Sequence, residues 1–231
     1  MRQLLLDLLP EAPPSLDNFV PGGNGEAQAA LRAWLGARAD DPCFLLWGDT
    51  GSGKTHLLRA SGLFYLDARQ NPALADLPQA ARDGAEDWAL DNLEALDPAG
   101  QGVFFNRINR VRAEGGGRLL CAARSAPFHL ALREDVRTRL GQGLIYRLEP
   151  LSDAEKLAAL EAQAKERAMP FTREGLSYLL CRASRDMRTL SSLVAALDRY
   201  SLERKRPITL PLLREALAAM PESRTHATGA L

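Results

Sequence analysis

The segment Gly48-Asp-Thr-Gly-Ser-Gly-Lys-Thr55 constrains this chain more than any other feature, because it matches the phosphate-binding pattern G-x-x-x-x-G-K-[ST]. Its glycines allow backbone N–H groups to turn toward an anion at close range. Lys54 would reach the β- and γ-phosphates of a nucleotide, and the Thr55 hydroxyl would hold Mg²⁺. An apolar run precedes the motif and Leu57-Leu58 continue it as a helix. The motif therefore predicts a P-loop between a strand and a helix that binds nucleotide phosphates.

Apolar runs that alternate with helical stretches predict the fold of the first two thirds of the chain. The runs are Cys43–Trp47, Leu63–Leu66, Trp88–Leu90, Arg118–Ala122 and Leu144–Leu148. Short buried strands separated by helices are typical of a parallel sheet with helices on both faces. Residues 26–38 are predicted to be one such helix. The helix after the P-loop is predicted to be short, since Gly62 follows Thr55 by seven residues.

The pattern changes after Pro150. Ser152-Asp-Ala-Glu155 has the form of a capping box and predicts the start of a helix that runs to about Ala168. Further helical spacing predicts helices over 173–183, 187–204 and 210–220. We therefore predict an α/β nucleotide-binding domain at 15–150 and a small all-helical domain at 151–220. Residues 1–14 and 221–231 are predicted to be flexible tails.

Composition limits the partners and the compartment. The formal net charge is zero, so a strong electrostatic attraction of the whole protein to nucleic acid or to a membrane surface is not expected. Three widely spaced cysteines without a C-x-x-C pair fit a reducing cytoplasm better than disulfides or a zinc site. No stretch approaches the ~20 apolar residues of a membrane helix.

The run Trp88-Ala-Leu-Asp91-Asn92 offers a second acid for the metal. Asp91 is predicted to follow an apolar strand and to hold Mg²⁺ facing the P-loop. Asn92 follows where many hydrolysing P-loop proteins have a glutamate, and an amide cannot take a proton from an attacking water. We therefore expect slow intrinsic hydrolysis.

With these residues placed, the chain resembles the AAA+ module of the bacterial replication initiator DnaA, and more closely the family of its short regulatory inactivator, Hda. The resemblance spans about residues 2–220. It is carried by the following segments: Leu16–Gly22, Leu46–Gly48, Leu90–Glu94, Arg139–Leu144, Leu148–Asp153 and Arg185–Leu190. It implies an AAA+ α/β domain followed by a helical lid, with ADP or ATP and Mg²⁺ as ligands. Homo-oligomers are possible in such a family.

The resemblance also implies roles for individual residues. Arg139 matches the arginine finger, which reaches a neighbouring molecule's γ-phosphate, while Arg188 matches the sensor arginine of the lid. Asn18, Phe19 and Val20 match the segment around the adenine base. The implied nucleotide-binding set is Phe19, Val20, Gly48, Thr50, Gly51, Ser52, Gly53, Lys54, Thr55, His56, Asp91 and Arg188. Within it we expect the side chains of Thr50 and Ser52 to be loop filler.

The N-terminal segment Gln3-Leu-Leu-Leu-Asp-Leu8 resembles the hexapeptide Q-L-x-L-x-L that binds the bacterial sliding clamp, the β subunit of DNA polymerase III. In an extended tail, alternate side chains can enter an apolar groove while the glutamine hydrogen-bonds at its rim. The implied clamp-binding residues are Gln3, Leu4, Leu6 and Leu8. The alternative is a tail that packs on its own domain.

One departure from the family and one difference from the complete initiator bear on activity. Cys121-Ala-Ala-Arg-Ser125 has alanines where relatives usually carry a polar sensor, which again indicates weak hydrolysis. The chain stops soon after the lid, so we expect no DNA-reading domain and only indirect contact with DNA. The favoured hypothesis is a cytoplasmic bacterial adaptor that stimulates hydrolysis of DnaA-bound ATP and so prevents re-initiation. The alternatives are a helicase-loader or transposition-type ATPase, and a non-catalytic ADP-sensing clamp adaptor.

Overall fold

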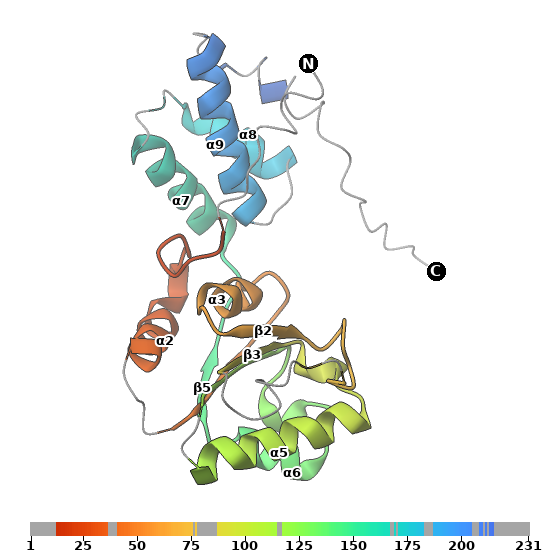
Figure 1. The fold of residues 1–231 in the computed structure, drawn as a ribbon. Helices are drawn as coiled ribbons and strands as arrows, with labels where there is room; N and C mark the ends of the chain where they lie inside the picture. The colour runs from red at the N-terminus through yellow and green to blue at the C-terminus, as the bar shows by residue number, and fades with distance from the viewer. Residues whose placement is uncertain are drawn as a thin grey trace. The chain divides into compact units, whose positions relative to one another are not determined.

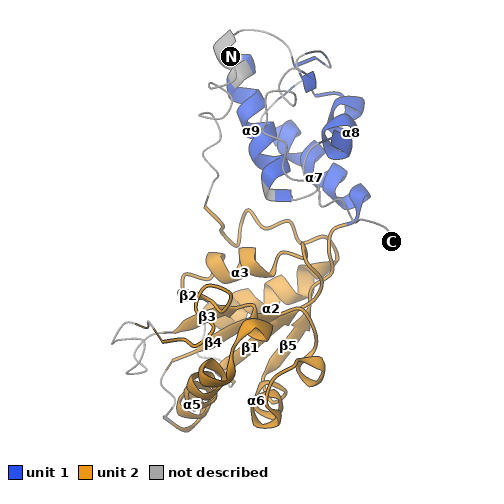
Figure 2. Cartoon of the chain, turned by 90° about the vertical axis from the view of Figure 1, so that its right-hand side faces the viewer, with its two compact units in different colours: residues 1–12, 152–231 blue, residues 13–151 orange. Residues whose placement is uncertain are grey.

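The computed structural model describes residues 13–36, 41–75, 77, 87–114, 117–166, 169, 171–182, 187–204, 208–209, 211 and 213–214. The described chain forms two compact units (Figure 2): residues 13–151 make up the first, and the described residues from Ser152 onward belong to the second. None of the helices in these ranges is long and apolar enough to cross a membrane.

The first unit is built on a five-stranded parallel sheet, as predicted. The strands are β1 (Cys43–Trp47), β2 (Phe64–Asp67), β3 (Trp88–Asp91), β4 (Leu119–Ala123) and β5 (Leu144–Arg147). Their order in the sheet is β2-β3-β4-β1-β5, and every neighbouring pair is parallel. All five carboxyl ends therefore lie at one edge of the sheet, where the P-loop and Asp91 also lie.

Helices cover both faces of this sheet (Figure 1). The helical segments of the unit are η1 (Gly22–Asn24), α2 (Gly25–Gly36), α3 (Lys54–Ala60), η2 (Leu93–Ala95), α5 (Pro98–Glu114), η3 (Pro127–His129) and α6 (Glu134–Leu140). Alternate residues of each strand point to opposite faces. Thus Leu46 packs with α2 and α3, whereas Leu45 packs with α5 and α6. Both leucines are buried.

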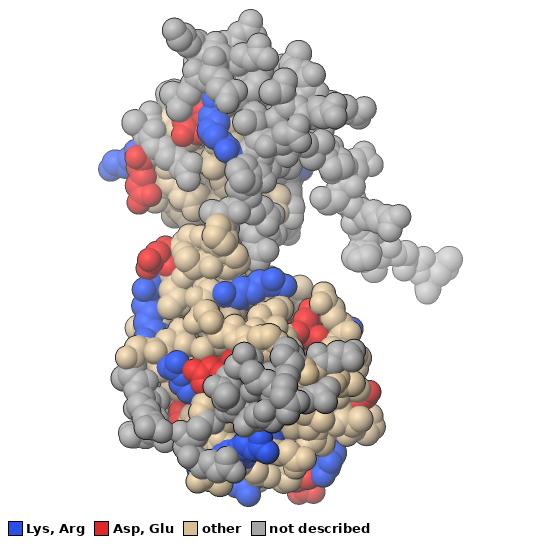
Figure 3. Space-filling view, in the orientation of Figure 1, with Lys and Arg blue, Asp and Glu red and all other residues tan. Residues whose placement is uncertain are grey.

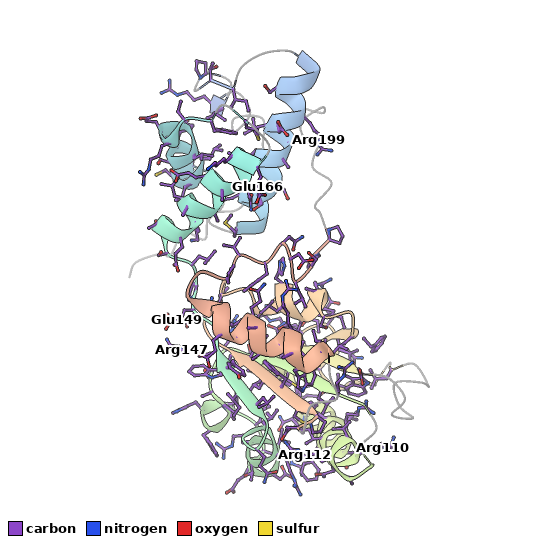
Figure 4. All side chains as sticks on the ribbon, turned by 90° about the vertical axis from the view of Figure 1, so that its left-hand side faces the viewer. Arg110, Arg112, Arg147, Glu149, Glu166 and Arg199 are labelled. Carbon is purple, nitrogen blue, oxygen red and sulfur yellow. The ribbon has the colours of Figure 1, made fainter. Side chains whose placement is uncertain are left out.

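The segment before the sheet is anchored to its end. Asn24 is buried, its amide donates to the carbonyl of Glu149 at 2.8 Å, and its side-chain oxygen accepts from the Glu149 N–H at 2.8 Å. Figure 4 shows Arg147 and Glu149 together at the end of β5, where they form an ion pair at 3.6 Å. These contacts fix the backbone that leads from Phe19 into α2.

The second unit is helical, with α7 (Asp153–Glu166), α8 (Arg173–Arg182) and α9 (Met187–Arg204). The predicted capping box begins α7: Ser152 Oγ accepts from the Glu155 N–H at 3.2 Å, and the Glu155 carboxylate accepts from the Ser152 N–H at 2.8 Å. Leucines of the three helices form the core, among them Leu160, Leu179, Leu190 and Leu197. The helix predicted over 210–220 lies mostly outside the described residues.

Candidate nucleotide-binding site

The loop after β1 has a backbone that only glycine adopts readily. Gly48, Gly51 and Gly53 have φ values of +148°, +85° and +94°. A Cβ on Gly48 would overlap the carbonyl oxygen of Leu148, and a Cβ on Gly53 would lie 2.6 Å from the Phe19 ring. The motif glycines therefore serve both the turn and the close packing around it. Thr50 is exposed within the same loop.

Lys54 is the first residue of α3, and its ammonium group lies over the loop. Nζ donates to the carbonyl oxygens of Gly48 at 2.6 Å and Asp49 at 2.8 Å, and to Ser52 Oγ at 3.2 Å. Ser52 is buried, so its side chain is not the loop filler that the sequence analysis expected. Its hydroxyl helps to hold the lysine against the loop.

Thr55 and Asp91 meet across the carboxyl edge of the sheet. Thr55 Oγ1 donates to Asp91 Oδ2 at 2.6 Å, although the two residues are 36 positions apart in sequence. The Asp91 side chain is buried at the end of β3. A hydroxyl and a carboxylate beside a P-loop lysine are the donor set that suits Mg²⁺ carried on a nucleotide.

Burial and nearby charges act on Lys54 in opposite directions. Burial lowers the pKa of its ammonium group, while the carboxylates of Asp91, Glu94 and Asp49 raise it. Arg124 lowers it further. Burial has the largest effect, so the pKa of Lys54 lies below its ordinary value, and a bound polyphosphate would oppose this shift by favouring the charged ammonium group.

The segment implied to surround the adenine base lies beside the loop. Phe19 is buried, and its ring lies 5.6 Å from the His56 imidazole between centroids. His56 Nε2 is 2.9 Å from the carbonyl oxygen of Ser15, which ties the segment to α3. Val20 is half-buried. The structure thus brings Phe19 and His56 to the P-loop, and Val20 follows Phe19 in the chain.

Three residues at this site were missed by the sequence analysis. The Tyr65 hydroxyl donates to Asp91 Oδ2 at 3.0 Å, and burial, followed by the charge and hydrogen bond of Asp91, raises the pKa of Tyr65 to about 12. Glu94 forms an ion pair with Arg124 at 3.4 Å, just beyond the end of β4. Their positions in the sequence could have indicated them, because each residue lies on or just after a strand whose carboxyl end faces the loop.

Asn92 is turned away from the P-loop. It adopts a left-handed backbone conformation with φ +58°, and its amide donates to Asp67 Oδ1 at 2.8 Å. The side chain therefore joins the ends of β2 and β3 instead of approaching Lys54.

Arg139 lies near the amino-terminal ends of the strands, whereas the P-loop lies at their carboxyl ends. It occupies the last turn of α6, is exposed, and its described contact is with Gln142 Oε1 at 3.4 Å. Just beyond α6, Gly143 approaches the backbone of Cys43, the first residue of β1. The P-loop follows the last residue of this strand, so roughly 13 Å of strand separate the two ends. Arg139 is thus remote from its own P-loop.

The remaining predicted residues belong to the second unit or lie outside the described residues. Arg188 belongs to α9 of the second unit, and its side chain is outside the described part. Gln3, Leu4, Leu6 and Leu8 also lie outside the described residues. Over the described ranges, no three His, Cys, Asp or Glu side chains form a metal-binding group. On the face of the first unit shown in Figure 3, basic and acidic side chains are intermingled.

Comparisons with known proteins agree with this architecture. Residues 153–217 match a family model described as the lid domain of Hda. The chain is 31% identical over 228 residues to a Haemophilus influenzae protein described only as uncharacterized, an alignment that covers 94% of this chain and 98% of that protein.

Solved structures show the same fold. Domain III of the Thermotoga maritima replication initiation protein DnaA has a TM-score of 0.68 at 20% identity, covering 90% of this chain and 98% of that one. AMPPCP-bound DnaA from Aquifex aeolicus has a TM-score of 0.63 at 20% identity, covering 86% and 71%. A Thermotoga maritima RuvB variant scores 0.61 at 18% identity, covering 91% and 72%. The α/β unit and its helical companion therefore have the AAA+ fold.

Proposed function

Because this chain belongs to the Hda family of DnaA-related AAA+ proteins, we propose that it is a regulatory inactivator of the replication initiator DnaA. In this proposal it binds ADP or ATP, docks on the sliding clamp, and stimulates hydrolysis of the ATP held by DnaA. Hydrolysis of that ATP would leave DnaA unable to initiate replication again.

The nucleotide site supports the first part of the proposal. Lys54 and the loop amides would bind the phosphates, while Thr55 and Asp91 would hold Mg²⁺, which neutralises phosphate charge when bound. Phe19, Val20 and His56 would contact the base. Arg188 would complete the site from the lid.

The position of Arg139 carries the proposal. Its guanidinium is exposed at the sheet edge opposite its own P-loop, and in the described part of the chain it has no ion pair. A guanidinium stabilises the charge that develops on a transferring phosphoryl group, provided that it can reach the phosphate. We propose that Arg139 does so for a nucleotide held by another molecule.

Intrinsic hydrolysis is proposed to be slow. Asn92 is bonded to Asp67, and an amide is no base for water in any orientation. Glu94, another carboxylate near Lys54, is paired with Arg124. We therefore propose that the bound nucleotide mainly holds the module in its working conformation.

The test is hydrolysis of labelled ATP preloaded on DnaA, with DNA-loaded clamp present. Wild-type protein should accelerate conversion to ADP, and Arg139→Ala should abolish the gain. Arg182→Ala is the matched control, because Arg182 is also exposed in the last turn of a helix but lies on α8, in the second unit. It should behave as wild type.

The same assay separates the alternatives. A DNA-stimulated turnover by the protein alone would favour a helicase-loader or transposition-type ATPase. Clamp binding without any acceleration, insensitive to Arg139→Ala, would favour a non-catalytic ADP-sensing adaptor. Either result would remove the proposed function.

A further inference from the structure

Phe128 is an aromatic side chain left in solvent. Among the described residues, large hydrophobic side chains are exposed at only three positions: Val103 at 37%, Phe128 at 69% and Leu144 at 37%. Phe128 is the largest of these and the most exposed. Rigid exposed aromatic side chains are the residues that most often anchor protein interfaces.

The backbone holds Phe128 in place. It lies in η3, where the His129 N–H donates to Ala126 at 2.9 Å and the Leu130 N–H donates to Pro127 at 3.2 Å. Arg137 Nη1 donates to the Phe128 carbonyl oxygen at 3.2 Å, which ties η3 to α6. The ring lies against Gly141, where an added Cβ would be 3.3 Å from Phe128 Cζ. An anchor fixed in this way loses little conformational entropy when it binds.

The ring has cationic neighbours. Arg137 and Arg139 both lie in the last turn of α6, and Phe128 packs at the end of that turn. Within the described chain neither arginine forms an ion pair. The other charged groups on α6 lie in its first turn, where Asp135 pairs with Arg133 and Glu134 is exposed. The end of α6 therefore has an exposed aromatic ring near the exposed guanidinium of Arg139 and the half-buried guanidinium of Arg137, neither of which is in an ion pair in the described chain.

We propose that Phe128, held by Arg137 and Gly141, forms a docking anchor for the nucleotide-bearing edge of the AAA+ module of ATP-bound DnaA. This inference rests on the proposed function, since Phe128 packs at the end of α6, the helix that carries the finger residue Arg139. The occupant is argued from charge complementarity: the rim of a nucleotide site combines anionic phosphates with apolar side chains around a base. Phe128 supplies affinity, while Arg139 supplies rate.

The experiment measures binding and hydrolysis separately. ATP-loaded DnaA is titrated against immobilised protein, and its ATP hydrolysis is followed in parallel with DNA-loaded clamp. Phe128→Ala should weaken binding about tenfold or more, and should raise the concentration for half-maximal stimulation equally, with the maximal rate unchanged. Arg139→Ala should lower the maximal rate and affect binding less.

The controls test location and fold. Val103→Ala truncates another exposed apolar side chain. Val103 lies on α5, outside the η3 and α6 segments that form the anchor. It should bind as wild type. Phe128→Leu should retain most of the affinity, and Phe128→Ala should unfold at the wild-type temperature, because the ring is mostly in solvent.

Two results would overturn the inference, and a third would overturn only the proposed function. The first is that Phe128→Ala binds ATP-loaded DnaA as tightly as wild type. If Arg139→Ala still abolished the stimulation of hydrolysis, the proposed function would remain supported without the docking inference. Another is a loss of self-association by Phe128→Ala with DnaA binding intact, which would make a second copy of this chain the occupant. If wild type binds DnaA through Phe128 but never stimulates hydrolysis, the docking inference stands and the proposed function fails.

Discussion

At the scale of single residues, Lys54 has the largest expected effect on ligand binding. Its ammonium group makes three hydrogen bonds within the P-loop, in reach of the groups that would hold phosphates. A charge-assisted hydrogen bond contributes about 1.5–3 kcal/mol. Lys54→Ala should therefore weaken ADP binding by roughly 10- to 100-fold, measured by calorimetry. Lys165 is exposed on α7, so Lys165→Ala should leave the affinity for ADP unchanged. Equal losses of affinity in the two variants would contradict the role of Lys54.

The P-loop glycines offer a matched pair of substitutions. Gly51 and Gly53 both have positive φ, but only Gly53 has a neighbour close to an added Cβ, the Phe19 ring at 2.6 Å. Gly51→Ala should cost about 1 kcal/mol of unfolding free energy from strain alone. Gly53→Ala should cost about 1–3 kcal/mol more, because the Phe19 ring must move.

Chemical denaturation compares the two glycine variants. Combining Gly53→Ala with Phe19→Ala should recover the steric part, so that the double variant loses less than the sum of the single losses. Strict additivity would show that Phe19 does not press on this glycine.

The sequence predicted that Asp91 faces the P-loop, and Thr55 Oγ1 donates to Asp91 Oδ2 at 2.6 Å, but the other hydrogen bonds of the site were not predicted. The motif indicated the roles of Lys54 and Thr55 because its spacing is local. By contrast, Tyr65 meets Asp91 only because β2 pairs with β3 in a register that sets Leu66 opposite Leu90. Strand order is a tertiary property, so the sequence contained no direct signal for that hydrogen bond.

At the scale of elements, the strands were predictable and two helices were not singled out. Cys43–Trp47 is fully apolar because both faces of β1 are covered, and such runs are characteristic of central parallel strands. In α5 the buried Phe104, Ile108 and Val111 have helical spacing, but Gly100, Gly102 and several polar residues dilute the pattern. The seven-residue α6 is too short to show a clear period.

The two units have separate cores, which predicts local effects of core truncation. Leu46 on β1 and Leu197 on α9 are both fully buried, each in its own cluster. Replacing either with Ala should cost about 2–5 kcal/mol. Hydrogen exchange should show Leu46→Ala loosening the sheet and Leu197→Ala loosening α7–α9. Equal loss of protection in both units from either variant would indicate a single cooperative core instead.

At the scale of the whole molecule, the proposal assigns different tasks to separate parts of the chain. The P-loop edge binds nucleotide, the end of α6 acts on a partner, and the N-terminal segment docks on the clamp. Because Arg139 and the P-loop lie at opposite edges of one sheet, substitutions at either can be made without contact with the other. Distant sites of this kind are expected to be additive in their effects.

The N-terminal segment is proposed to act by tethering the protein to the clamp, without changing the chemistry of ATP hydrolysis. Docking on DNA-loaded clamp would raise the local concentration of Arg139 near DnaA without altering the guanidinium. Deleting residues 1–9 should therefore raise the protein concentration for half-maximal ATP hydrolysis by DnaA about 10²-fold or more, with the same maximal rate at saturation. Arg2→Ala, outside the hexapeptide, serves as the control and should match wild type. A lower maximal rate in the deletion variant would mean that the segment contributes to the active complex itself. An unchanged half-maximal concentration would mean that the clamp is recruited elsewhere or not at all.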